Sequence, residues 1–306
     1  MTAVLLISAL LIGCLLAVQA SVNIQLGTAL GTPYGASTAQ LMVATTILAL
    51  LALTAGALGA LGALPDATWW HLVGGLASPL YITSGILLFP RVGAVLSVGL
   101  FVTGQVFASL ALDGGGLLDV PRRPLTAATV AGAVAVLAGI STIVAGHRAG
   151  GIPVARAGWL GLGLVAGAAL PVQGAVNARL RADLGEPLAV GLVSFAVATL
   201  TIVVVLLVLL AVKGTARPRV GALGTVPWWG WLGGACGATY VTSVFLLIPE
   251  IGAAPTVALT VAGQQLASVL VDRHGLLRLP RRPVTARRLA GIAALLGGVA
   301  LVTAAG

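Results

Sequence analysis

An internal repeat constrains this chain more than any other feature. Residues 104–126 and 263–285 are identical at thirteen of 23 positions when they are aligned at an offset of 159. Each copy closes an apolar segment, forms a polar turn containing Pro-Arg-Arg-Pro, and opens another apolar segment. A unit of about 150 residues is too long for a solenoid period of about 20–50 residues. A unit that contains several apolar segments indicates a duplicated membrane bundle.

The composition supports an integral membrane protein. Of the 306 residues, 59% are hydrophobic and 8% are charged, and the mean hydropathy is +1.11. A soluble domain carries about 25% charged residues, so this chain lacks the polar groups to cover a hydrated surface. The net charge of +9 comes from basic residues in short loops between apolar segments, where they set topology. We therefore expect no nucleic-acid partner.

A bilayer-spanning helix needs about 20 apolar residues, and ten such segments can be placed. The first could also be a secretory signal ending at Val18-Gln19-Ala20, but no Lys or Arg precedes it and its pattern recurs at 167–177. It is predicted to be a retained helix. The predicted spans are residues 2–22, 34–54, 70–89, 92–112, 126–146, 158–177, 188–212, 227–248, 252–271 and 288–305.

The repeat divides the chain into residues 1–150 and 151–306, joined by a linker at 147–156. The offset between equivalent positions is 154 in the front part of each unit, as in Asn23/Asn177, and 159 from Trp69/Trp228 onward. Five helices is an odd number, so the second unit must enter the membrane from the opposite side. The predicted fold is all-α and polytopic, with ten transmembrane helices in two inverted five-helix repeats.

Charge counting predicts the orientation. The loops after spans 1, 3, 5, 7 and 9 hold 12 basic residues, and the other loops hold 4. The positive-inside rule places the first set in the cytoplasm and both termini outside. Most of this bias comes from the single loop 273–288.

These motifs resemble the drug/metabolite transporter (DMT) superfamily, EamA-like, and within it the two-domain YdcZ type (DUF606). The resemblance covers nearly the whole chain, once per half. It implies an integral transporter-like protein of the bacterial cytoplasmic membrane with five helices per half, and it fixes no substrate. Many ten-helix members are held to have cytoplasmic termini, opposite to the charge count. The matching features are Gln19 to Asn23, Pro33, Trp69-Trp70, Gly74-Gly75, Tyr81, Pro90 to Gly93, Gly104-Gln105 and Pro121 to Pro124.

Polar side chains inside the spans are the candidate substrate-binding residues, because an unpaired polar group in hydrocarbon costs several kcal/mol. Gln19 and Asn23 share one helix face, as do Gln173 and Asn177. They are predicted either to line a central cavity or to hydrogen-bond between helices. The further candidates are Gln105, Gln264, Gln265, Tyr81, Tyr240, Ser84 and Ser243, whose hydroxyls can alternatively bond their own helix backbone.

Glu250 is the one acidic residue that the predicted spans place near membrane depth, at the turn between spans 8 and 9. Two interpretations remain open: a coupling site for a proton or cation, and a solvated loop carboxylate. No acid is expected inside the first or sixth span, which argues against a glutamate-centred drug/proton antiport.

The resulting hypothesis is a secondary transporter that moves a small solute by alternating access between the halves. A passive pore and a non-transporting membrane scaffold are the alternatives. We expect no enzyme, catalytic residue, metal or cofactor, because no span carries a suitable constellation and no P-loop is present. The functional unit is expected to be a monomer with a pseudo-two-fold axis, or a dimer of it, in the lipid bilayer.

Overall fold

The computed structural model describes residues 2–92, 94–145, 157–278, 281 and 285–304. In these residues the chain is helical and contains no strand. The α-helices are α1 (Thr2–Leu30), α2 (Pro33–Thr54), α3 (Ala77–Val92), α4 (Ala94–Gly115), α5 (Ala127–Ala145), α6 (Ala157–Leu184), α7 (Pro187–Ala211), α8 (Leu232–Ile251), α9 (Ala253–His274) and α10 (Ala286–Ala304). Short 3₁₀ helices are η1 (Ala57–Asp66), η2 (Trp69–Leu76), η3 (Leu117–Asp119), η5 (Val220–Thr225), η6 (Trp228–Trp231) and η7 (Leu276–Arg278).

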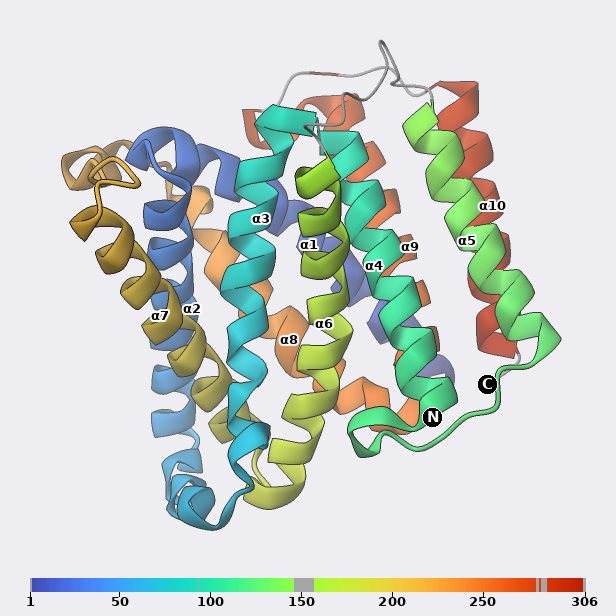
Figure 1. Ribbon diagram of the computed structural model, residues 1–306, viewed down its shortest axis with the longest axis horizontal. Helices are drawn as coiled ribbons and strands as arrows, with labels where there is room; N and C mark the ends of the chain where they lie inside the picture. Colours follow the sequence, from blue (N-terminus) through green and yellow to red (C-terminus); the bar gives the residue numbers. More distant parts are fainter. Residues whose placement is uncertain (1, 93, 146–156, 279–280, 282–284, 305–306) are drawn as a thin grey trace.

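Successive helices cross the molecule in alternating directions (Figure 1). α1 starts at the lower end of the view in Figure 1, whereas α6 starts at the upper end, so the two halves of the chain are antiparallel. Nine helices are long and apolar enough to cross a membrane among the described residues, and the apolar part of α5 is shorter, at 127–142. The prediction of an all-α polytopic membrane protein is confirmed. The predicted boundary at residue 150 lies outside the described residues.

Several predicted spans differ from the observed helices. α1 and α6 each continue about two turns beyond the predicted ends, to Leu30 and Leu184, so the predicted amide pairs lie within these helices. Each helix stops at a glycine with φ of +72°, Gly31 and Gly185. A proline that opens the next helix follows two residues later. Glycine tolerates this left-handed backbone and proline suits the first helical turn, so the same signal ends both helices.

The spans that start with tryptophan pairs begin in 3₁₀ helices, η2 and η6, before α3 and α8. Trp69 and Trp228 are largely exposed at these equivalent positions, as expected for anchors at a membrane interface. α2 ends at Thr54 because Gly56 adopts a φ of +70°, and the apolar stretch that follows forms the separate helix η1.

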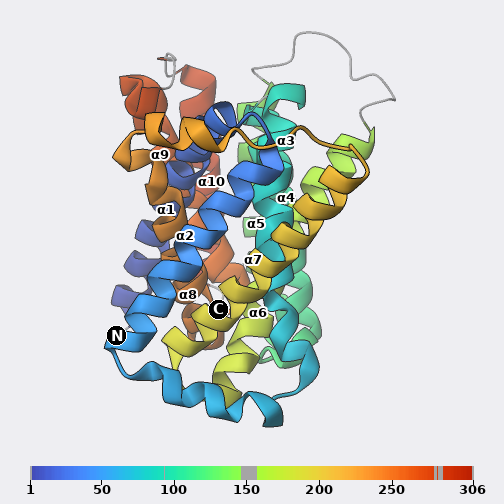
Figure 2. The ribbon, with the colours of Figure 1, turned by 90° about the vertical axis from the view of Figure 1, so that its left-hand side faces the viewer.

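The two halves pack mainly against each other. α1 lies on α9, α4 lies on α6, and α5 lies on α10. Figure 2 shows α2 and α7 side by side on the face of the bundle nearest the viewer, where they are in contact. Each of these pairs joins one helix from each half, so the core that positions any central site belongs to both halves together.

Glycines allow the closest of these approaches. A Cβ at Gly13 would overlap the carbonyl oxygen of Thr260, and one at the equivalent Gly167 would overlap that of Phe101. Gly104 and Gly263 meet the backbone of α6 and α1 in the same way. Small residues let helix backbones touch, and in a membrane this replaces the hydrophobic driving force between helices.

Candidate functional site

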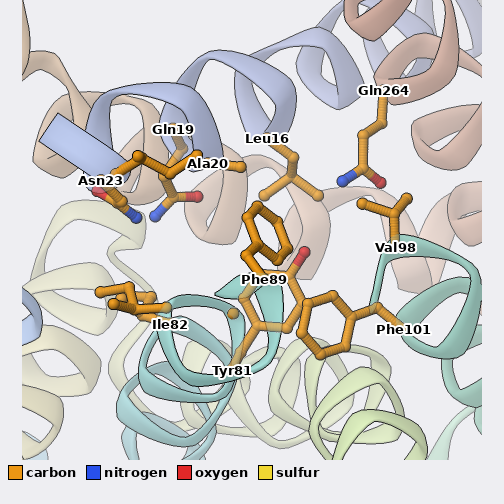
Figure 3. Close-up of a pocket in the computed structure, with 13 residues that line it drawn as sticks. Leu16, Gln19, Ala20, Asn23, Tyr81, Ile82, Phe89, Val98, Phe101 and Gln264 are labelled. Atoms are coloured by element: carbon orange, nitrogen blue, oxygen red, sulfur yellow. The ribbon is translucent and has the colours of Figure 1, made fainter. Parts of the chain in front are cut away.

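A cavity of about 40 Å³ lies between α1, α3, α4 and α9 (Figure 3). Its lining comes from the middle of α1, residues 81–89 of α3, the start of α4 and one residue of α9. These parts of the helices lie from mid-bundle toward the upper end of the view in Figure 1. A cavity of this size has room for about three water molecules. The lining residues are Leu16, Gln19, Ala20, Asn23, Ile24, Tyr81, Ile82, Gly85, Ile86, Phe89, Val98, Phe101 and Gln264.

Four of the predicted site residues line this cavity, and three of them are amides. Gln19 and Asn23 project from α1 and Gln264 from α9, with all three side chains at least 93% buried. Asn23 Oδ1 and Gln264 Oε1 have no hydrogen-bond partner within the described part of the chain. A buried polar atom without a partner costs about 1–3 kcal/mol, so these amides are available to a ligand or to water.

Tyr81 and two phenylalanines form the apolar wall opposite α1. The Tyr81 and Phe101 rings lie 4.9 Å apart between centroids, and Phe89 closes the same wall (Figure 3). The Tyr81 side chain reaches toward Gln264 across the cavity. The lining therefore combines aromatic and aliphatic surface with a few convergent polar groups, which is the composition of small-molecule sites.

The equivalent amides of the second half donate to serine hydroxyls, although Asn177 Oδ1, like Asn23 Oδ1, has no partner among the described residues. Gln173 Nε2 donates to Ser78 Oγ at 2.8 Å, and Asn177 Nδ2 donates to Ser194 Oγ at 3.0 Å. Ser78 in turn donates to Gln173 Oε1 at 3.2 Å. These bonds tie α6 to α3 and α7, and neither Gln173 nor Asn177 is among the residues that line the cavity. Here the interhelical hydrogen-bonding interpretation fits the geometry.

The space equivalent to the cavity is filled in the second half. Gly85 and Ile86 of the cavity wall correspond at the 159 offset to Val244 and Phe245, which are both buried. A Cβ on Gly174, the equivalent of Ala20, would lie 2.8 Å from Val244 Cγ1. The two halves therefore share a backbone arrangement, and larger side chains stand in the second half at positions that line the cavity in the first.

The remaining candidates are not among the cavity-lining residues. Gln105 is fully buried in α4, and neither its Nε2 nor its Oε1 has a hydrogen-bond partner among the described residues. Gln265 is also buried, and its Nε2 likewise has no partner there. Tyr240 and Ser84 are buried, and Ser243 is half-buried.

Glu250 is exposed on the last turn of α8, at the lower end of the bundle in Figure 1 and away from the cavity. The buried acid is instead Asp113 in α4, which corrects the expectation that only Glu250 could lie at membrane depth. Asp113 accepts hydrogen bonds from the backbone N–H groups of Ala253 and Ala254 at 2.8 and 2.7 Å, and so caps α9 of the other half. The second copy of the repeat has Asp272 at the equivalent position, and this recurrence was the signal in the sequence that could have indicated a role for Asp113. The side chain of Asp272 is not among those that the structure describes.

Gln40 is a further buried amide that the sequence pattern did not indicate. It lies in α2, donates to the Gly233 carbonyl oxygen at 3.3 Å, and has an unpartnered Oε1 among the described residues. A Cβ at Gly237 would lie 2.7 Å from Gln19 Nε2, so Gly237 leaves the space that Gln19 uses. At the 154 offset Gln40 corresponds to Ser194. Because one copy has an amide and the other a hydroxyl, a search for identical polar residues in the two copies does not find this position.

Comparison with known proteins identifies the class. The sequence model of the family described as "Putative inner membrane exporter, YdcZ" matches residues 4–142 and again residues 158–301. The chain therefore belongs to this family and is an integral protein of the inner membrane. One crystal structure, of a protein with 21% sequence identity, covers 97% of this chain and 96% of its own with a TM-score of 0.65, so the two share a fold. No curated protein matches the chain.

Proposed function

We propose that this protein is a secondary transporter that binds a small solute in the cavity between α1, α3, α4 and α9. The observation that carries the proposal is the set of buried amides facing that cavity, because Asn23 Oδ1 and Gln264 Oε1 have no partner within the described residues. Among the described residues with unpartnered amide atoms, Asn23 and Gln264 line this cavity, whereas Gln40, Gln105, Asn177 and Gln265 do not. A solute that offers donors to the oxygens of Asn23 and Gln264 would remove their desolvation penalty.

Alternating access is the proposed mode. Two antiparallel halves that pack on each other through α1, α9, α4 and α6 can rock about their shared interface. At about 40 Å³ the cavity is too small for an ordinary metabolite. Binding of the solute therefore requires α1 or α3 to move, and the mobile unit that we propose is one half of the chain.

The solute that fits this lining is small and amphipathic. Its polar part would face Gln19, Asn23 and Gln264, and its apolar part would lie on the aromatic wall of Tyr81, Phe89 and Phe101. No lining residue of the cavity is charged. An uncompensated ionic group would therefore be costly there.

A ligand screen followed by a flux assay tests this function. Purified protein is screened for metabolites that raise the melting temperature, since a ligand that binds the folded state stabilises it by mass action. Hits are then measured for saturable uptake into proteoliposomes. We expect Gln264→Leu to weaken binding about tenfold, whereas Gln265→Leu, its buried neighbour outside the cavity lining, retains affinity. Equal affinity in both variants, or flux that never saturates, would overturn the proposal, and the second result would favour a pore.

Glu250 provides a check on coupling. Its exposed carboxylate lies away from the cavity, so we expect Glu250→Gln to transport with an unchanged pH profile. A profile that shifts in this variant would return Glu250 to the mechanism.

A further inference from the structure

A second hollow, of about 380 Å³, lies at the opposite end of the bundle from the cavity. It is formed by the last three turns of α6, the turn after η3, and the last turn of α8, all at the lower end of the view in Figure 1. Its lining residues are Val120, Pro121, Ala175, Ala178, Arg179, Arg181, Ala182, Gly185, Ile248 and Pro249. It is therefore mostly apolar, with two cationic side chains.

Arg179 and Arg181 are the only charged residues in that lining. Nearby acids on the same segment are engaged elsewhere: Asp183 pairs with His71 of η2, and Glu186 accepts from the Leu188 N–H to cap α7. Asp119 and Glu250 are exposed and do not line the hollow. The hollow thus has a net positive charge against low-dielectric walls, where a charge–charge attraction is stronger than in water.

The repeat shows that packing does not require these charges. At the 154 offset Arg179 and Arg181 correspond to Gln25 and Gly27. Gln25 Nε2 donates to the Leu277 carbonyl oxygen at 3.3 Å, and Arg179 likewise donates to the carbonyl oxygen of Asp119 at the equivalent turn. A neutral amide therefore makes the same kind of helix-to-turn bond in the first half. The cationic groups are an addition found only in the second half.

We propose that this hollow is an anion-binding site for a phosphate group, with Arg181 as the principal ligand and Arg179 as the second. Guanidinium groups present planar pairs of N–H donors that match phosphate oxygens. Within the described residues Arg181 makes no hydrogen bond or ion pair, so its donors are free for a ligand. The phosphate can belong to a soluble anion or to the headgroup of an acidic phospholipid whose chains follow the apolar side of the hollow.

The site goes beyond the proposed transport function and is tested independently of it. Purified full-length protein in neutral detergent is melted in inorganic phosphate at constant ionic strength set with chloride. In parallel it is melted with short-chain phosphatidylglycerol, with phosphatidylcholine as the neutral lipid. We expect a rise in melting temperature with one or both phosphate carriers and none with phosphatidylcholine. Stabilisation by phosphate indicates a soluble anion, and stabilisation by phosphatidylglycerol alone indicates a lipid headgroup.

The variants identify the site. Arg181→Gln is expected to raise the phosphate or lipid concentration needed for half the shift by about tenfold. Arg179→Gln places the amide of the first half at this position, which keeps the helix-to-turn bond, and the double variant is expected to lose the shift. Arg217→Gln, an exposed arginine at the other end of the bundle, is the control. Equal shifts in all variants, or no shift with either carrier, would overturn the site. If the double variant fails to fold, the Arg181→Gln titration decides alone.

Discussion

The two halves of the chain share one backbone arrangement but carry different side chains at equivalent positions. In the first half, Gly85 leaves room for a cavity, and Gln19 and Asn23 face it. In the second, the buried side chains of Val244 and Phe245 stand at the equivalent positions, and the amide N–H groups of Gln173 and Asn177 donate to Ser78 and Ser194. The comparison teaches that duplication fixes the course of the backbone, whereas a few exchanges of side-chain volume and of hydroxyl groups change what surrounds equivalent amides.

The largest expected effect concerns the opposite orientation of the two halves in the membrane. Reporter fusions after Pro124 and after Pro283 are expected to lie on opposite faces of the membrane, with an all-or-none difference in reporter activity. The charge count places the second fusion in the cytoplasm. If both fusions report the same compartment, the equivalence of the halves and the shared core fail together.

The next effect concerns the close helix contacts at glycines, which occur at equivalent positions in both halves. Gly167→Val should prevent folding, because its Cβ would overlap the carbonyl oxygen of Phe101 in α4, and a backbone atom cannot move aside as a flexible side chain can. We expect a loss of about 4 kcal/mol or more, seen as aggregation in size-exclusion chromatography. Gly161→Val in the same helix is the control, since its Cβ would meet no atom within 4 Å. A monodisperse Gly167→Val protein would contradict the close contact of α6 with α4.

Filling the cavity would remove the main difference between the halves. Gly85→Val places in the first half the residue that the second half carries at position 244. A Cβ there would meet only the Phe101 ring, at 3.8 Å, so the fold should tolerate it. We expect about a tenfold or greater loss of affinity for the screened ligand with the melting temperature nearly unchanged. Gly158→Val, in open space on α6, is the control, and unchanged binding in Gly85→Val would place the site elsewhere.

The smallest expected effect is a difference in protein stability between variants of the two amide pairs, Gln19/Asn23 and Gln173/Asn177. Gln173→Leu should destabilise the protein by about 1–3 kcal/mol, because it leaves the buried Ser78 hydroxyl without its amide partner. Gln19→Leu, in contrast, removes an amide that makes no hydrogen bond in the described part of the chain and should leave stability equal or higher. Thermal unfolding of the two variants in the same detergent measures the difference. Equal losses would show that both clusters are structural.

Asp113 shows how much of the site the sequence could indicate. Its recurrence as Asp272 was visible in the repeat, but its function was not, because the carboxylate caps α9, which begins 140 residues later. Gln40 was missed for a similar reason: its contact with Gly233 exists only because α2 and α8 pack together. Glu250 was a candidate because it adjoins a span, and the continuation of α8 to Ile251 places it on an exposed last turn.

The sequence by itself determined the class of this protein, an all-α polytopic membrane protein. Apolar segments long enough to span a bilayer must satisfy their own backbone hydrogen bonds as helices, and a duplicated unit with an odd number of helices must invert. It also named four of the residues that line the cavity. Only the tertiary structure showed which amide pair lines a cavity and which donates to serines, because these contacts depend on neighbours from other helices. Equivalent positions in a duplicated chain share a backbone path, but Gly85 and Val244 leave very different space beside it.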